Sequence, residues 1–170
     1  MTPVFVYTNY PTAELFINGK SYGKQSKNNS SLKSRYRLMW MDAVYEPGEV
    51  KVVAYNKDGK AVAEKTVRTA GKPHHIELVS NRNELTADGK DLAYVTVKVV
   101  DKDGNLCPTD SRLIHFSVKG AGKFRAVANG DPTNLEQFHL PKMHAFHGML
   151  TAIVQAGEIA GDLVLTAKAS

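Results

Sequence analysis

The sequence predicts an all-β protein built from two consecutive β-sandwich domains, and three observations lead to this fold class. No window carries apolar residues at i, i+3, i+4 and i+7 over the length that a helix needs. Short alternating segments are separated by turn residues roughly every 8–12 positions, which is typical of a sandwich or barrel. Small residues with a Gly and a Pro at 69–74 separate two strand-rich halves. The 170 residues are also too few for a (β/α)₈ barrel, which needs about 250.

The first domain is predicted to span residues 1–70. An apolar strand at 4–7 opens it, and residues 13–17 form the first arm of a hairpin. Asn18-Gly19 follows, and this pair tolerates the positive φ angles of a type I′ turn. Further strands are expected at 37–41, 50–55 and 61–67, with turns at 46–48 and 58–59.

A linker is predicted at 71–74, and the second domain at 75–170. Alternation of apolar and polar residues is clearest from Ala93 to Val100, which indicates a strand with one buried face. The strands expected in this domain lie at 76–79, 93–100, 113–118, 123–128, 150–155 and 163–167. Residues 129–148 carry few strand signals and form the longest connection, and long connections in compact domains are often functional.

Composition and charge exclude several classes of protein. The 22 basic and 17 acidic residues give a net charge of +5, but Asn and Ser interrupt the basic residues between 20 and 37, so no nucleic-acid partner is predicted. No apolar run reaches the length of a membrane span, and no signal peptide precedes the first strand, so no membrane association is expected. Cys107 is the only cysteine, which excludes an internal disulfide and a cysteine-rich zinc site.

Short motifs that resemble catalytic or ligand-binding signatures fail on their context. Residues 19–23 match G-x-S-x-G, but they follow a hairpin turn and no helix can follow them. Residues 120–123 lack the spacing of a phosphate loop, and residues 101–105 lack the Gly position and distal Glu of a calcium loop. Acidic residues are scattered, and no pair suited to glycoside hydrolysis can be named. We therefore predict no catalytic residue and no cofactor.

The connection at 129–148 is the predicted place for a binding site. Imidazoles and a carboxylate can bind zinc, but the spacing here matches no zinc motif, so no metal is predicted. The residues that could take part in a metal site are His139, His144, His147 and Asp131. Contacts to a sugar or to another protein surface are assigned to Phe138, Phe146, Asn129 and Asp131. Trp40 lies in an apolar stretch and is predicted to be a core residue.

Several segments of this chain resemble a known family. Residues 13–23, AELFINGKSYG, resemble a hairpin of the sandwich domain that follows the catalytic barrel in many bacterial β-galactosidases of glycoside hydrolase family 2. Residues 37–41 and 45–55 resemble the next strands of that domain. The second domain is similar to the bacterial immunoglobulin-like domain that closes the same enzymes. The segments that carry this second likeness lie at 85–90, 99–105, 128–131 and 145–148.

This resemblance implies two consecutive immunoglobulin-like β-sandwiches and a non-catalytic role. Family members hydrolyse terminal β-galactosides or related β-glycosides by a retaining mechanism, and the two glutamates that they use belong to the barrel. The expected function is that of an accessory region that braces the catalytic module, with the rest of the parent glycosidase as its partner. The alternative is a carbohydrate-binding module that tethers the enzyme to polysaccharide, and an adhesin-like array is a third interpretation. The resemblance also implies a periplasmic or secreted location.

Overall fold

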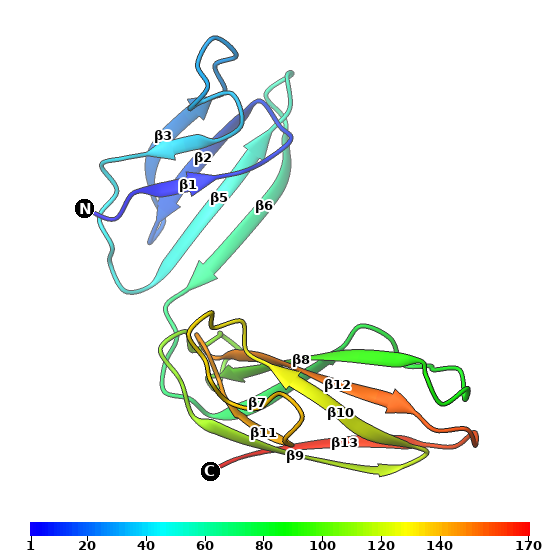
Figure 1. The fold of residues 1–170 in the computed structure, drawn as a ribbon. Coiled ribbons are helices and arrows are strands. Elements are labelled where there is room, and N and C mark those ends of the chain that lie inside the picture. The colour runs from blue at the N-terminus through cyan, green and yellow to red at the C-terminus, as the bar shows by residue number, and fades with distance from the viewer. The chain divides into compact units, whose positions relative to one another are not determined.

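A computed structural model describes all residues from 1 to 170 and contains thirteen β-strands and no helix (Figure 1). The predicted all-β fold class is therefore confirmed. The chain divides into two compact units, Met1–Thr69 and Ala70–Ser170. Because no helix forms, no helical segment of the length and apolarity that a bilayer requires is present.

The first unit contains two antiparallel sheets. Four strands form the larger sheet in the order β3-β2-β5-β6, and β1 pairs with β4 in the smaller one. The strands are β1 (Val4–Val6), β2 (Thr12–Ile17), β3 (Lys20–Ser26), β4 (Leu38–Trp40), β5 (Glu49–Tyr55) and β6 (Ala61–Arg68). The smaller sheet is thus built from segments more than thirty positions apart, which places two apolar strands over the larger sheet.

The predicted hairpin at Asn18-Gly19 is confirmed. Both residues have positive φ angles, 49° and 79°, and the register pairs Ile17 with Lys20 across the turn. The Asn18 side chain also accepts a hydrogen bond from the backbone N–H of Glu49 at 2.7 Å. The turn residue therefore sets the hairpin and also fixes the start of β5.

The core of the first unit forms where β2 and β4 face each other. β2 alternates between buried and half-buried positions along its whole length, and Leu15 in its centre is fully buried. Leu38 and Trp40 of β4 are each 1% exposed, so the prediction of Trp40 as a core residue is confirmed. The Trp40 indole N–H donates to the carbonyl of Gly23 at 3.0 Å, which satisfies its one polar atom.

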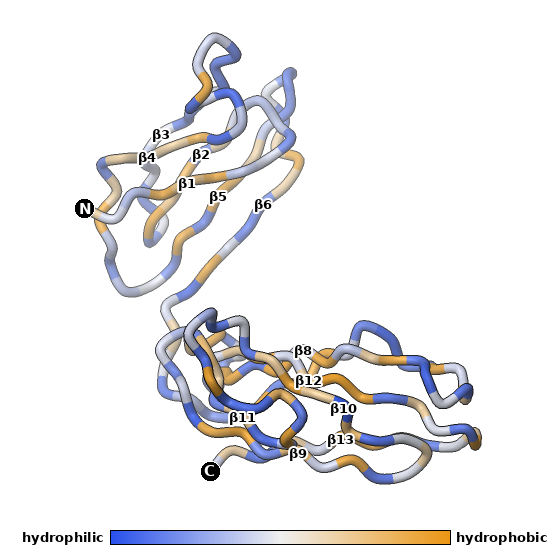
Figure 2. The backbone as a smooth tube through the Cα atoms, in the orientation of Figure 1, coloured by the Kyte–Doolittle hydropathy of each residue, from blue (hydrophilic) through white to orange (hydrophobic).

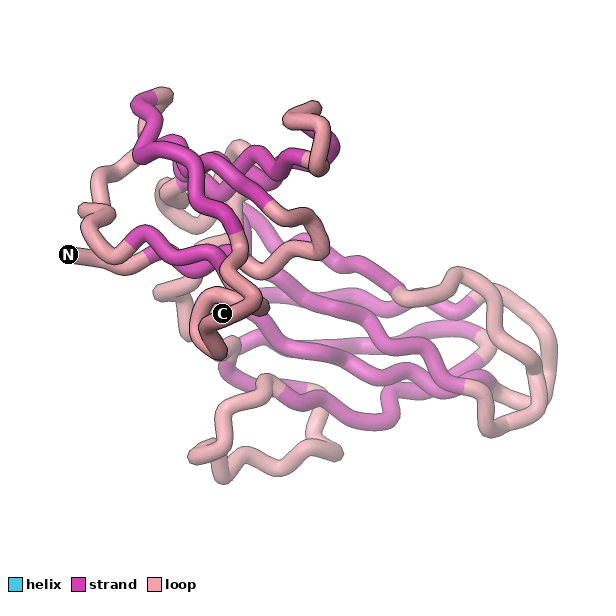
Figure 3. Tube along the Cα trace, turned by 90° about the horizontal axis from the view of Figure 1, so that it is seen from above, coloured by secondary structure: helices cyan, strands magenta, loops and turns pink.

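The second unit is a sandwich of a four-stranded and a three-stranded antiparallel sheet (Figure 3). The order is β10-β12-β8-β7 in the larger sheet and β11-β9-β13 in the smaller. The strands are β7 (His75–Ser80), β8 (Leu92–Val100), β9 (Leu113–Gly120), β10 (Gly122–Ala128), β11 (Lys142–His144), β12 (Met149–Ala156) and β13 (Leu163–Ala169). The sequence did not predict β11, which is only three residues long and lies within the connection at 129–148.

Alternating apolar residues of the central strands build the core of this sandwich, and they appear as orange bands along the trace (Figure 2). Val97 and Val99 of β8 are buried against Ile114 and Phe116 of the opposite sheet. β8 and β12 pair in register, Val97 opposite Leu150, which aligns their buried rows. The alternation of apolar and polar residues in the sequence therefore places the apolar side chains on one buried face of the sheet.

Candidate functional site

The connection between β10 and β12 contains several hydrogen bonds that its own side chains make. The side-chain amide of Asn129 donates to the carbonyl of His144 at 3.0 Å, which joins the two ends of the connection. Asp131 accepts two hydrogen bonds from Thr133, at 2.8 Å from the backbone N–H and at 2.7 Å from the hydroxyl. These bonds lower the pKa of Asp131, so the carboxylate is charged, and one of its oxygens is already hydrogen-bonded within its own turn.

Glu136 and His144 form a side-chain contact within this connection, which is an ion pair when the imidazole is protonated. The Glu136 carboxylate lies 3.1 Å from the His144 ring Nδ1 and accepts the His144 backbone N–H at 3.1 Å. Burial raises the pKa of Glu136, but the hydrogen bonds and charge of His144 outweigh this, and the net shift is downward. The pair ties the loop to β11, and the sequence prediction had not named Glu136.

The structure does not gather the predicted metal candidates into a ligand set. His139 and His144 are exposed, and Asp131 turns back onto Thr133. His147 lies at φ 51° beside the carbonyl of Pro108, with its Nδ1 at 3.3 Å. No group of three or more His, Cys, Asp or Glu side chains within metal-binding reach occurs among the 170 residues.

The aromatic candidates for sugar stacking are Tyr22, Tyr36 and Tyr45 in the first unit and Phe138 and Phe146 in the second. Phe138 is 56% exposed, whereas Phe146 is half-buried and packs on the ring of His147 at a centroid distance of 4.2 Å. Tyr36 and Tyr45, in the first unit, are 63% and 56% exposed. Within each unit, no stacked or edge contact joins any two of these rings. Each presents a single surface on which a sugar ring could stack.

Asp101 is a structural residue whose role the sequence did not reveal. It is 2% exposed and accepts hydrogen bonds from the backbone N–H groups of Gly71 at 2.8 Å, Asp103 at 2.9 Å and Asn105 at 2.8 Å. The bond from Gly71, followed by those from Asn105, lowers the pKa of Asp101 to about 2. The predicted turn at this position therefore also anchors the segment that enters the second unit.

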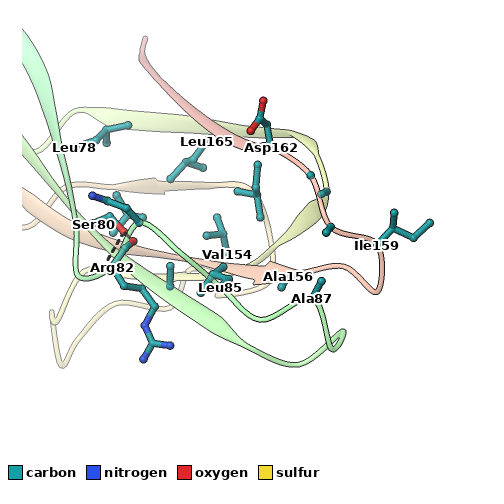
Figure 4. Close-up of a pocket in the computed structure, with 17 residues that line it drawn as sticks. Leu78, Ser80, Arg82, Leu85, Ala87, Val154, Ala156, Ile159, Asp162 and Leu165 are labelled. Atoms are coloured by element: carbon teal, nitrogen blue, oxygen red, sulfur yellow. Dashed lines mark hydrogen bonds between the residues drawn. The ribbon is translucent and has the colours of Figure 1, made fainter.

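A pocket that the sequence did not predict lies in the second unit. It has a volume of about 600 Å³ and opens between β7 and β13, with the connections at 81–91 and 157–162 around it (Figure 4). Most of the residues that line it have apolar side chains, and Asp162 is the only carboxylate among them. Arg82, at its rim, is paired with Asp91 at 3.0 Å. Since glycoside hydrolysis uses two carboxylates across a cleft, this pocket has no catalytic pair.

Family models match both units of the chain. Residues 76–170 match the model described as glycoside hydrolase family 2 C-terminal domain 5, and residues 1–63 match a domain of unknown function, DUF4982. The chain belongs to glycoside hydrolase family 2. Its thirteen strands provide sandwich domains of that family and no catalytic barrel, so the accessory role expected from the sequence agrees with the family assignment.

Relatives of this family 2 chain are much longer proteins. It is 44% identical over 161 residues to the beta-galactosidase BoGH2A of Bacteroides ovatus, which covers 95% of this chain and 18% of that protein. It is 30% identical to a beta-galactosidase of Thermoanaerobacter pseudethanolicus, covering 97% of this chain and 22% of that protein. The chain thus spans about a fifth of the length of these two curated relatives.

Solved structures show the same fold. A glycosyl hydrolase family 2 member from Bacteroides cellulosilyticus superimposes with a TM-score of 0.84 at 35% identity, over 98% of this chain and 22% of that one. A beta-glycosidase from Bacteroides vulgatus superimposes with a TM-score of 0.89 at 30% identity, over 99% of this chain and 21% of that one. The match over nearly the whole chain includes both sandwich units.

Proposed function

We propose that this chain is a non-catalytic accessory region of a family 2 β-galactosidase and braces the catalytic module of that enzyme. The observation that carries the proposal is the 44% identity to a beta-galactosidase along 95% of the chain. The parent enzyme would hydrolyse terminal β-galactosides of glycans, and the rest of that polypeptide is the partner of the two sandwiches.

The features of the two units support a bracing role. Their buried side chains are almost all apolar, and Asp101 is the only buried charged residue. Asp101 accepts backbone hydrogen bonds, as a structural carboxylate does. The connection at 129–148 is held by internal bonds such as Glu136 to His144 and presents Phe138 to the surface. A loop with internal hydrogen bonds and an exposed aromatic ring is suited to contact another protein surface.

The experiment compares three proteins on nitrophenyl-β-galactoside: residues 1–170 alone, the parent enzyme, and the parent without these residues. Residues 1–170 should give no turnover above a buffer blank, while the parent should hydrolyse the substrate. The shortened parent should have a lower melting temperature or a lower soluble yield. Turnover by residues 1–170, or a shortened parent as stable and soluble as the full one, would contradict the proposal. Nitrophenyl-β-glucuronide as a second substrate tests the galactoside assignment.

Binding of carbohydrate is a second candidate function, favoured by the exposed rings of Tyr36, Tyr45 and Phe138. Calorimetric titration of residues 1–170 with galactan tests it, and Tyr36→Ala, Tyr45→Ala and Phe138→Ala each remove one stacking surface. If residues 1–170 release or absorb heat that saturates with galactan, and one of these variants abolishes that heat, the polysaccharide is a partner. A flat titration removes the carbohydrate partner and leaves the bracing role.

We also propose a periplasmic or secreted location, which the resemblance to the family implies. Immunodetection in fractionated cells of the source organism tests it. Signal confined to the cytoplasmic fraction would contradict the location and leave the bracing role intact.

A further inference from the structure

The sandwich of the second unit is open along one side. Its larger sheet ends at β7 and its smaller sheet ends at β13, and these two edge strands approach each other beside the 600 Å³ pocket. Leu78 of β7 and Leu165 of β13 both line this pocket (Figure 4). The larger sheet therefore has one strand more than the smaller sheet, and neither β7 nor β13 has a strand paired on its outer side.

The apolar side chains along this opening are incompletely buried. On the central strand β12 the inward-facing residues Leu150 and Val154 are each 3% exposed. The corresponding inward residues of β13, Leu163 and Leu165, are only half-buried, and Leu78 of β7 is 38% exposed. Inward-facing apolar side chains that remain accessible to solvent indicate a part of the core that no further element covers.

The backbone of β13 shows what kind of cover would fit. At the two ends of its pairing with β9, the backbone carbonyl of Asp162 accepts the N–H of Ala121 at 2.8 Å, and the N–H of Ser170 donates to the backbone carbonyl of Leu113 at 3.1 Å. Alternate residues of an antiparallel strand turn their backbone groups to opposite sides, so the even-numbered residues face β9. The N–H and C=O groups that face the free edge belong to Leu163, Leu165, Ala167 and Ala169.

Two features thus coincide on the same residues. Leu163 and Leu165 present apolar side chains to the pocket and unpaired backbone donors and acceptors to its edge. A small ligand could fill the pocket, but only an extended polypeptide can satisfy a row of backbone groups at a strand repeat of about 6.8 Å. The partner chemistry is therefore a β-strand whose alternate residues are apolar.

We propose that one further β-strand pairs with the free edge of β13 and closes the sandwich, and that the parent glycosidase supplies it from outside residues 1–170. The added strand makes the smaller sheet four-stranded and lies opposite β7, where it covers Leu78. If the added strand paired with β7 instead, the larger sheet would have five strands against three in the smaller sheet. The inward-facing side chains of β13 would then remain uncovered.

The source of the strand follows from length and connectivity. This inference rests on the proposed function, under which the chain is part of a larger polypeptide. The matched relatives are about five times longer, so most of such a polypeptide lies outside these residues. A tethered strand acts at an effective concentration near the millimolar range, which removes the need for a tight intrinsic affinity. A free, partly apolar edge left open would also favour aggregation.

Amide hydrogen exchange at residue resolution tests the proposal in two proteins, residues 1–170 alone and the parent enzyme. In residues 1–170 alone, the amides of Leu165 and Ala167 should exchange fast, while those of Thr166 and Lys168 are protected by β9. In the parent, Leu165 and Ala167 should exchange at least about tenfold more slowly, the change that a newly formed internal hydrogen bond brings. Equal exchange of these two amides in both proteins would overturn the proposal.

A pair of substitutions in the parent separates the two faces of β13. Leu165→Lys places a charge in the pocket and should restore fast exchange at Ala167, whereas Thr166→Lys on the exposed outer face should leave its protection unchanged. Unchanged protection in Leu165→Lys would count against the proposal.

Sedimentation velocity of residues 1–170 tests a second copy as the occupant. A dimer with Leu165 and Ala167 protected would overturn the assignment to the parent, and a monomer supports it. Hydrolysis of nitrophenyl-β-galactoside by the parent is measured separately, so failure of the proposed activity and failure of the strand pairing are distinguishable.

Discussion

Leu15→Ala tests whether the first unit is held together by the core between β2 and β4. Leu15 is fully buried in a cluster with Leu38 and Trp40. Removal of a buried Leu side chain costs about 2–5 kcal/mol, because the transfer free energy is lost and a cavity remains. A unit of this size is stabilised by about 3–10 kcal/mol in total. The substitution therefore removes a large share of that stability.

Trp40 provides the assay, since it is the only tryptophan and lies in the same core. Its emission shifts to longer wavelength when the unit unfolds, so thermal melting followed by fluorescence reports on this unit. A loss of about 3 kcal/mol in a domain of this size lowers the melting temperature by roughly 12–24 °C.

The matched control is Leu32→Ala, in which the same side chain is removed from a site that is 79% exposed. Surface substitutions of this kind change stability by at most about 0.5 kcal/mol, so the melting temperature should shift by no more than roughly 4 °C. If Leu15→Ala lowered the Trp40-detected transition no more than Leu32→Ala, the assignment of the core to these residues would be refuted.

Three further predictions concern the second unit. The pKa of Asp101 lies below its ordinary value, so the stabilising contribution of its carboxylate is present above pH 3.8 and is lost as the pH falls through about 2. Asp101→Asn should therefore reduce the dependence of unfolding on pH between these values. An unchanged acid transition in this variant would exclude Asp101 as the anchor. Burial raises the pKa of the Cys107 thiol, so a disulfide reagent should react slowly at pH 8 and quickly in denaturant, whereas equal rates would show that the site is open. In Gly148→Ala the new Cβ would lie 2.3 Å from the Cys107 carbonyl oxygen at φ 72°, a loss of roughly 2–4 kcal/mol. Gly104→Ala, at φ 81° with open space around it, should lose only about 1 kcal/mol, and equal losses would contradict the steric argument.

Period and turn chemistry were sufficient to predict most of the strands. The Asn18-Gly19 pair predicted a hairpin, and both residues adopt the positive φ angles that such a turn needs. The alternation from Ala93 to Val100 predicted a strand with one buried face, and Val97 and Val99 are buried on it. These signals are local, because a period of two and a left-handed turn depend only on neighbouring residues.

Local signals failed where a strand owes its existence to a partner far away in the chain. β11 spans only Lys142–His144, which is too short for an alternation of apolar and polar residues to predict a strand, yet it pairs with β9. β3 is polar along almost its whole length because it lies at the exposed edge of its sheet. Glu136 was missed for the same reason, since its role depends on the approach of His144 across the connection.

The sequence by itself determined the all-β class, the positions of most strands along the chain and the family, because these depend on residue patterns that can be read along the chain. Tertiary structure alone decided which strands became edges and which polar residues were buried. Asp101 looked like an ordinary turn residue until Gly71 was brought to its carboxylate. Leu163 and Leu165 read as ordinary strand residues, and only the pairing of β13 with β9 left their backbone groups at a free edge beside a pocket. Long-range pairing creates such features, and no local pattern encodes them.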